Sequence, residues 1–158
     1  MKDFNPTRYT LKCVATGREF EDTGWILDDS ECKNPSLVRA TYEHKQLEVK
    51  PDEYGLYKFC DWLPIKRMLQ GSAAPVTYRS EALAKHLGLS NLWITLNGYA
   101  PQRGAKMRTC SFKETEAYSV CARIDENEER VLVVASAGNT ARAFARVCSD
   151  NNIKLLLV

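Results

Sequence analysis

The 158-residue sequence lacks both the long apolar segment of a membrane protein and the strong charge of a nucleic-acid-binding protein. No apolar run approaches the roughly 20 residues that cross a bilayer, and residues 1–6 have no apolar centre of a secretory signal. The 22 basic and 20 acidic side chains leave a net charge of +2, which creates no overall field for an anionic polymer or surface. These absences predict a cytoplasmic protein that binds neither nucleic acid nor membrane.

Cysteine and glycine are too sparse for two common kinds of small motif. The six cysteines are widely spaced along the chain, which argues against a disulfide scaffold and predicts free thiols. None of the eight glycines is adjacent to another, so the sequence has no glycine-rich loop that would hold a cofactor phosphate. The length still allows one ordinary core, or a small domain with an appendage.

Residues 1–70 are predicted to form a β-rich arm and the start of the next region. Tyr9, Leu11 and Cys13 alternate with polar residues, and a turn at Thr16-Gly17 follows, which indicates a short hairpin. The sequence is then interrupted by small residues and proline over 71–75.

Residues 71–158 alternate between strand and helix patterns and are predicted to form an α/β region. A strand over 76–79 leads to a helix that begins after Ser80 and ends at Gly88, and another strand covers 92–96. A further helix begins near Lys113, with its apolar stripe at Ala117, Val120, Cys121 and Ile124.

The end of the sequence reads as a βαβ unit. A continuous apolar run over 131–135 predicts a buried parallel strand, and it leads into Ser136-Ala137-Gly138-Asn139-Thr140. A helix with Ala141, Phe144, Val147 and Cys148 on one face follows, and then an apolar strand over 154–158. Open α/β sheets bind ligands at such turns, after the carboxyl end of a strand.

Together, Ser111-Phe112-Lys113 before a helix and Ser136-x-Gly138-Asn139-Thr140 after a strand resemble the fold-type II pyridoxal-phosphate enzymes. This is the superfamily of threonine synthase and cysteine synthase. The resemblance implies that Lys113 is the catalytic lysine that holds pyridoxal 5'-phosphate as a Schiff base, and that Asn139 binds the ring hydroxyl of the cofactor. It also implies a substrate carboxylate site, formed by Ser136, Ala137, Gly138 and Thr140.

The same resemblance implies the fold: a three-layer αβα small domain with a parallel sheet, preceded by the β-rich arm. In related threonine synthases a similar arm carries paired cysteine knuckles that bind zinc. Here Cys13 and Cys32 stand alone at the equivalent places. Two thiolates cannot supply the four ligands of a closed zinc site, so the arm is predicted to be a degenerate zinc ribbon without a metal.

Within the superfamily, Tyr99-x-Pro-x-Arg103-Gly-Ala and Pro75-Val-Thr-Tyr-Arg-Ser-Glu are most similar to the cysteate synthase family. This implies a β-replacement of coenzyme M biosynthesis, in which O-phospho-L-serine and sulfite give L-cysteate and phosphate. Threonine synthase chemistry on O-phosphohomoserine and sulfide addition to O-phosphoserine are the alternatives. The segment from Arg103 to Lys113 has four basic residues and no acidic one. It is either a solvated loop or an attraction for these two anions.

Enzymes of this superfamily are more than twice as long, and they carry the cofactor's phosphate loop in a second domain. The sequence is therefore expected to be an amino-terminal portion that works with a complementing chain or as a homo-oligomer. A rival hypothesis is a catalytically inert paralogue that acts as a partner or sensor subunit.

Overall fold

The computed structural model describes residues 8–158, so residues 1–6, which carry no signal-like pattern, lie outside it. The chain forms two compact units, and their segments alternate along the sequence. The first unit comprises Met1–Val49 and Phe59–Pro64, and the second comprises Lys50–Lys58 and Ile65–Val158. The 3₁₀ helix η1 (Gly55–Trp62) contains residues of both units, and its helical geometry is broken at Phe59, the first residue that belongs to the first unit.

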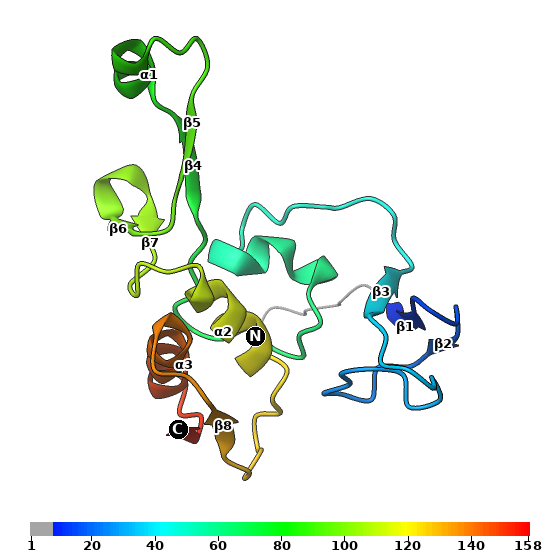
Figure 1. Ribbon diagram of the computed structural model, residues 1–158. Coiled ribbons are helices and arrows are strands. Elements are labelled where there is room, and N and C mark those ends of the chain that lie inside the picture. Colours follow the sequence, from blue (N-terminus) through cyan, green and yellow to red (C-terminus); the bar gives the residue numbers. More distant parts are fainter. Residues whose placement is uncertain (1–7) are drawn as a thin grey trace. The chain divides into compact units, whose positions relative to one another are not determined.

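The first unit is built on a three-stranded antiparallel sheet with the order β2-β1-β3 (Figure 1). The strands are β1 (Tyr9–Cys13), β2 (Glu19–Phe20) and β3 (Val38–Tyr42). The turn between β1 and β2 closes where the Gly17 N–H donates to the Cys13 carbonyl at 2.9 Å. The predicted hairpin is therefore confirmed.

A buried carboxylate fixes the loop that follows this hairpin. Asp29 accepts hydrogen bonds from the Arg18 guanidinium, with Nε 3.0 Å from Oδ1, and from the Glu31 N–H at 3.1 Å. The Arg18 guanidinium also lies 4.6 Å from the centre of the Phe20 ring. The hydrogen bonds from Arg18 lower the pKa of Asp29 from 3.8 to about 2.

Residues 8–158 contain no metal centre near the sheet of the first unit. Cys13 is fully buried and Cys32 is half-buried, and residues 8–158 contain no group of three or more metal-ligating side chains. The β1–β2 hairpin is present, but its descent from a zinc ribbon stays a prediction.

The first strands of the second unit form an antiparallel hairpin that carries a helix between them. Strands β4 (Val76–Arg79) and β5 (Trp93–Leu96) pair throughout, and α1 (Glu81–Leu87) lies in their connection. As predicted, α1 ends at Gly88, which adopts a left-handed conformation with φ 67°. A second short hairpin follows, with β6 (Tyr99–Ala100), the 3₁₀ turn η2 (Pro101–Arg103) and β7 (Ala105–Lys106).

The predicted βαβ unit is present at the end of the chain. Strand β8 (Leu132–Val134) pairs in parallel with β9 (Leu155–Leu157), and α3 (Asn139–Asp150) connects them. This is the one parallel pair among the described residues, where the other sheets are antiparallel. Residues 8–158 thus form a mixed α/β structure, as predicted, but they do not by themselves form the expected three-layer parallel sandwich.

The strands of this parallel pair are less buried than their sequences predict. Val133 is 57% exposed and Leu156 is 51% exposed, although both belong to continuous apolar runs. The two residues are paired in register, so they lie on the same face of the pair, and this apolar face is open to solvent among the described residues. No helix among the described residues is long and apolar enough to cross a bilayer.

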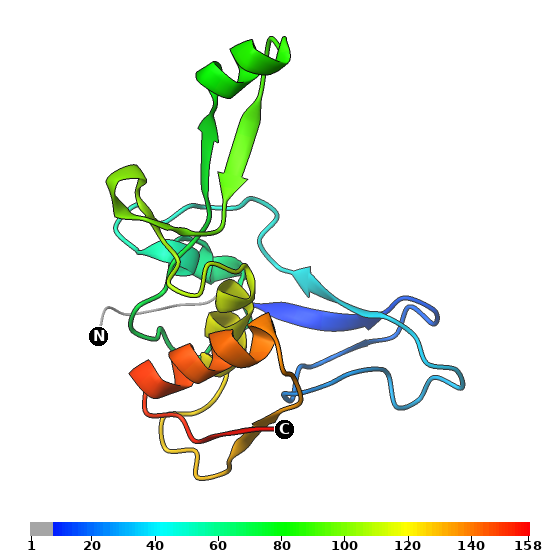
Figure 2. The same cartoon turned by 60° about the vertical axis from the view of Figure 1, so that its left-hand side comes forward.

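The core of the second unit lies where α2 (Lys113–Cys121) packs on α3, and both ribbon views show the two helices side by side (Figures 1 and 2). The Sγ atoms of Cys121 and Cys148 are 3.7 Å apart at the centre of this interface, and both are free thiols. Tyr57 closes the core from η1, because its hydroxyl accepts the Leu69 N–H at 3.0 Å and its ring meets the edge of the Tyr118 ring.

Two glycines allow the chain to approach this core closely. Gly55 has φ 61°, and a Cβ there would lie 2.6 Å from the backbone of Ser72. Gly71 has φ 85°, and a Cβ there would lie 2.8 Å from the hydroxyl of Tyr118. Both positions therefore require glycine, for its backbone freedom and for its lack of a side chain.

The Asp29 carboxylate predicts acid sensitivity of the first unit. Because its pKa is lowered in the fold, its stabilising effect is complete above about pH 4 and is lost as the pH falls toward 2. Hydrogen exchange of the β1 amides, corrected for the intrinsic rate at each pH, should show this loss of protection. Asp29→Asn should be less protected already at pH 5, whereas Glu19→Gln, in the exposed pair with Lys12, should behave as the native chain. Equal behaviour of the two variants would contradict the assigned role.

A pair of glycine variants separates backbone strain from steric overlap in the second unit. Gly104 has φ 77° but no atom within 4 Å of an added Cβ, so Gly104→Ala should cost about 1 kcal/mol of unfolding free energy. Gly55→Ala adds overlap with Ser72 and should cost about 2–4 kcal/mol. Urea denaturation measures both values, and a Gly55→Ala cost no greater than that of Gly104→Ala would refute the close approach.

Candidate functional site

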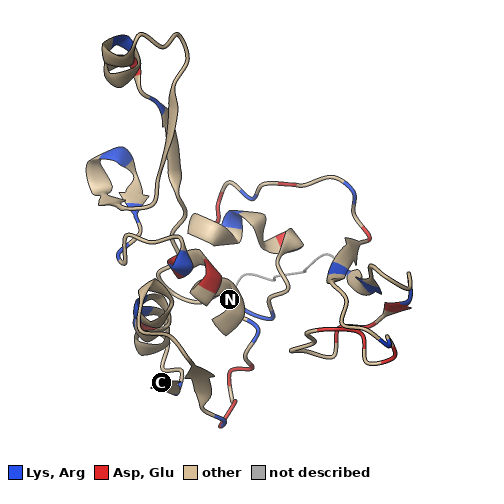
Figure 3. Ribbon diagram, in the orientation of Figure 1, with Lys and Arg blue, Asp and Glu red and all other residues tan. Residues whose placement is uncertain are grey.

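Lys113 is the first residue of α2, where the predicted helix begins. Its N–H donates to Ser111 Oγ at 3.3 Å, and the Thr115 N–H donates to the Phe112 carbonyl at 3.0 Å, so the preceding turn is continuous with the helix. The side chain of Lys113 is 32% exposed, and its Nζ lies 2.6 Å from Oε2 of Glu116. The first turn of α2 therefore carries both signs of charge, as Figure 3 shows. The amine is oriented by this ion pair and is accessible from solvent.

Glu114, the next residue, has a structural role that the sequence reading missed. Its side chain is fully buried, and Oε2 accepts the backbone N–H of Thr109 at 2.7 Å. This hydrogen bond returns the loop to the start of the helix and so fixes the turn that presents Lys113. A local signal was available, because a glutamate in the first turn of a helix is placed to accept backbone N–H groups.

The buried face of α2 differs from the predicted stripe because of this glutamate. The structure buries Glu114, Ala117, Tyr118 and Cys121, whereas Val120 and Ile124 are only partly buried. Ala117 and Cys121 confirm half of the predicted stripe. Burial raises the pKa of Tyr118 well above its usual range, and the nearby carboxylate of Glu114 raises it further.

The turn from Ser136 to Thr140 connects the end of β8 to the start of α3. The Gly138 N–H donates to Ser136 Oγ at 3.3 Å, and the Arg142 N–H donates to the Gly138 carbonyl at 3.1 Å. Ala137, Gly138 and Asn139 are exposed, and an added Cβ at Gly138 would meet no atom within 4 Å. The backbone N–H groups of the first helical turn are therefore accessible and have no intrahelical acceptor.

The two motifs occupy equivalent positions, since each lies at the amino-terminal end of one of the two helices that pack together. Within residues 8–158, no hydrogen bond or ion pair joins Lys113 to the turn at 136–140. The buried face predicted for α3 is confirmed at Ala141, Phe144, Val147 and Cys148. The structure thus supports the placement of both motifs at helix starts, and their joint use of one ligand stays a prediction.

The basic segment before Lys113 is not a uniformly solvated loop. The Arg103 guanidinium lies 5.2 Å from the centre of the Tyr78 ring, and the Lys106 ammonium lies 5.4 Å from that of Tyr54. Arg108 is exposed and forms no ion pair with a described residue. Several cations of this segment are therefore held near aromatic rings while their charges remain available.

A turn after the carboxyl end of a parallel strand is where α/β enzymes bind their ligands. Three of the curated relatives to which this chain is similar are named cysteate synthases. The chain is 48% identical to that of Methanosarcina mazei over 138 residues, which covers 87% of this chain and 32% of that enzyme. It is 45% identical to that of Methanosarcina acetivorans and 44% identical to that of Methanococcoides burtonii, with 96% of this chain covered and 35% and 36% of the two enzymes.

This similarity confirms the resemblance predicted from the two motifs: the chain is related to the cysteate synthases over nearly all of its length. It spans about a third of the length of the relatives it matches, which is consistent with the predicted amino-terminal portion. No family model matches the chain. No solved structure matches it either.

Substitutions in the first turn of α2 test the hydrogen bond between the buried Glu114 carboxylate and the Thr109 N–H. Glu114→Ala leaves the Thr109 N–H buried without an acceptor, so it should lower the free energy of unfolding by about 1–3 kcal/mol. Glu116→Ala changes an exposed glutamate of the same turn, and its effect should stay within about 0.5 kcal/mol. Urea denaturation compares the two, and hydrogen exchange should show the Thr109 amide losing protection in Glu114→Ala alone. Retained protection would disprove the assigned hydrogen bond.

Proposed function

We propose that this chain is the lysine-bearing part of a cysteate synthase-like enzyme that uses pyridoxal 5'-phosphate. In the proposed reaction, sulfite replaces the phosphate of O-phospho-L-serine, and the products are L-cysteate and phosphate. The observation that carries the proposal is the identity of 44–48% to named cysteate synthases, on a chain that places Lys113 at an accessible helix start.

The residues at the two helix starts are compatible with this cofactor. Lys113 offers an amine that is partly exposed, with an ion pair to Glu116 and the Phe112 ring as its neighbours. Asn139 offers an exposed amide, and Gly138 leaves open space beside it. When bound, pyridoxal phosphate supplies an electron sink that stabilises a carbanion at the substrate Cα. Lys113 would hold the cofactor, and Asn139 would donate to its ring hydroxyl.

The proposed roles of the protein groups follow from their chemistry. The amine of Lys113, once free, takes the proton from the substrate Cα and later returns it. The accessible N–H groups after Ser136 attract the substrate carboxylate, because a helix start carries partial positive charge. Phosphate leaves with the electron pair of its C–O bond, and the sulfur of sulfite supplies the pair for the new C–S bond.

Two features favour this reaction over the alternatives that use other nucleophiles. Its substrates are both anionic, and the basic segment from Arg103 to Lys113 contains no acidic residue. The relatives with up to 48% identity are named cysteate synthases. Water addition to O-phosphohomoserine and sulfide addition to O-phosphoserine remain the alternatives within the superfamily. An inert partner or sensor subunit is the alternative of another class.

A further protein segment is proposed to cover the parallel pair β8–β9. Parallel strands are normally buried on both faces, yet Val133 and Leu156 are half-exposed or more. The relatives are about three times as long as the matched region. A complementing chain, or a second copy of this one, would bury the open face and provide the groups that hold the cofactor phosphate.

Covalent trapping tests the cofactor assignment without requiring turnover. The chain is mixed with pyridoxal phosphate, alone or with the remaining part of the Methanosarcina mazei enzyme as a separate chain, and is then reduced with borohydride. Peptide mass mapping should find the label at Lys113 at several times the occupancy of exposed lysines, because a built site binds the cofactor before it reacts. Lys113→Ala should remove this label and the visible absorbance together.

The control for this experiment is Lys85→Ala, which changes an exposed lysine on α1. It should leave the labelling of Lys113 unchanged. Absence of preferential labelling at Lys113 in both mixtures would refute the enzymatic proposal and favour the inert subunit. Labelling only in the second mixture would support the need for a complementing chain.

A further inference from the structure

Two of the six cysteines meet inside the second unit, and neither belongs to the motifs predicted for the cofactor or the substrate. Cys121 is the last residue of α2, and Cys148 lies near the end of α3. Their Sγ atoms are 3.7 Å apart, and both residues are buried, with 0% and 2% of their surface exposed. Because they are 27 positions apart in the sequence, the packing of the two helices alone brings them together.

The two thiols are close to the geometry of a disulfide, although both are free. A disulfide joins its sulfur atoms at about 2.05 Å, so the Sγ atoms of Cys121 and Cys148 must approach by about 1.7 Å. Rotation of these short side chains and a small shift of one helix can supply this approach, because packed helices move past one another by similar distances.

The contact between the two sulfurs makes them chemically unequal. A hydrogen bond from the Cys121 S–H lowers the pKa of Cys148, and the same hydrogen bond raises the pKa of Cys121, which burial raises further. Cys148 is therefore the first of the two to ionise. The thiolate is the form of cysteine that attacks an oxidant, so Cys148 is the residue that reacts first.

From the position and separation of the two sulfurs we propose that Cys121 and Cys148 are a redox pair, which a peroxide converts into a disulfide between α2 and α3. The Cys148 thiolate attacks one oxygen of hydrogen peroxide and becomes a sulfenic acid, while the other oxygen leaves as hydroxide. The sulfur of Cys121 then attacks the sulfenic sulfur, and the sulfenic oxygen leaves as water after taking the proton of Cys121. Each thiol has lost one hydrogen, and the peroxide is reduced to two molecules of water.

The end of α2 offers the oxidant a route to this buried pair. Helix ends open more readily than helix interiors, and α2 ends at Cys121 itself. Lys113 and Asn139, by contrast, are the first residues of α2 and α3. The disulfide would therefore tie the helices together away from both predicted motifs, and the redox pair does not depend on the proposed function.

Peptide mapping of the native chain tests the redox pair without any substitution. The folded chain is treated with hydrogen peroxide, the remaining thiols are blocked with iodoacetamide during denaturation, and the chain is digested with trypsin. Trypsin cuts after lysine and arginine, so each of the six cysteines falls in a different peptide. The peptides 114–123 and 147–154 should appear as one disulfide-linked species, which reduction with dithiothreitol should separate.

Three variants locate the bond. Cys121→Ala and Cys148→Ala should each abolish the linked species, because the disulfide needs both sulfurs. Cys110→Ala is the matched control at the exposed cysteine before Lys113, and it should leave the linked species unchanged.

Urea denaturation shows whether the bond fits the folded interface. A disulfide across 27 positions restricts the unfolded chain, so the oxidised native chain should unfold at a higher urea concentration than the reduced chain. This difference should vanish in Cys121→Ala.

The redox pair is refuted if the linked species is absent at a peroxide dose that oxidises the exposed Cys110. It is also refuted if the linked species forms in urea but not in the folded chain, or if the oxidised chain unfolds at a lower urea concentration, since the bond would then not fit the native packing. Trapping of pyridoxal phosphate at Lys113 is a separate measurement, so failure of the redox pair is distinguishable from failure of the cofactor assignment.

Discussion

The packing of α2 on α3 is the contact on which the second unit depends. Cys121 faces Cys148 across it, Tyr118 is buried on the same helix, and Tyr57 meets the edge of the Tyr118 ring. Fully burying an apolar side chain such as Phe144 or Val147 of α3 contributes about 1.5–3 kcal/mol, which is large compared with the marginal stability of a small domain. Both motifs predicted to carry the chemistry lie at the starts of these two helices. The same interface therefore fixes the fold and positions Lys113 and Asn139.

Burial of Glu114 shows how this arrangement constrains the loop before Lys113. A carboxylate that leaves water must receive hydrogen bonds, and the Thr109 N–H provides one inside the protein. The loop cannot move away without leaving that carboxylate unsatisfied. Lys113, one residue earlier, is instead held at the surface by an ion pair with Glu116 and by the nearby Phe112 ring, 5.2 Å from its ammonium. A rigid backbone thus carries a side chain that can exchange its partner, which is what a lysine that binds a cofactor and moves a proton requires.

The sequence predicted those parts of the fold that depend on local patterns. The β1–β2 hairpin, the end of α1 at Gly88 and the buried face of α3 follow from alternation, glycine and apolar spacing. The face of α2 was predicted only in part, because a buried glutamate breaks the apolar pattern on which such predictions rest. The exposure of Val133 and Leu156 could not be predicted either, because the sequence of an apolar strand does not say whether another layer will pack on its face.

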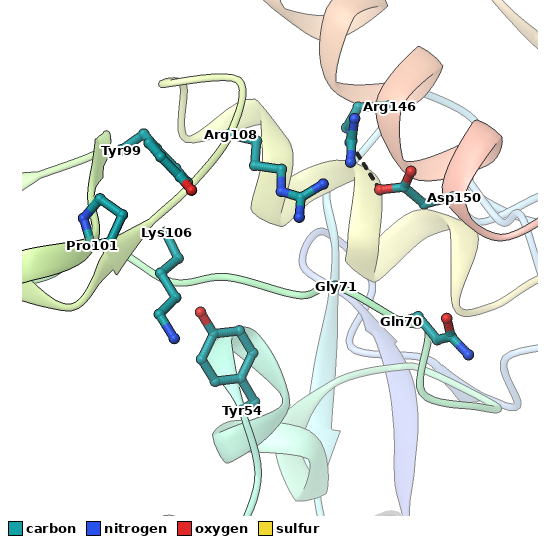
Figure 4. A pocket seen from close by; sticks show the side chains of 9 residues that line it. All are labelled: Tyr54, Gln70, Gly71, Tyr99, Pro101, Lys106, Arg108, Arg146 and Asp150. Atoms are coloured by element: carbon teal, nitrogen blue, oxygen red, sulfur yellow. Dashed lines mark ion pairs between the residues drawn. The ribbon is translucent and has the colours of Figure 1, made fainter.

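In the candidate site, too, the local motifs could be predicted from the sequence, and the features that depend on packing could not. A helix-start lysine and a Ser-x-Gly-Asn-Thr turn can be read from the sequence, because each lies within a few consecutive residues. A basic cavity of the second unit could not be predicted, since its lining residues Tyr54, Lys106 and Arg146 come together only through the packing of the segment before η1, the β6–β7 hairpin and α3 (Figure 4). Two of its three cations, Lys106 and Arg108, belong to a basic run that by itself could be a solvated loop. The packing places Arg146 in the same cavity as Arg108. Several cations around one cavity attract an anion more strongly than the same charges spread over a surface.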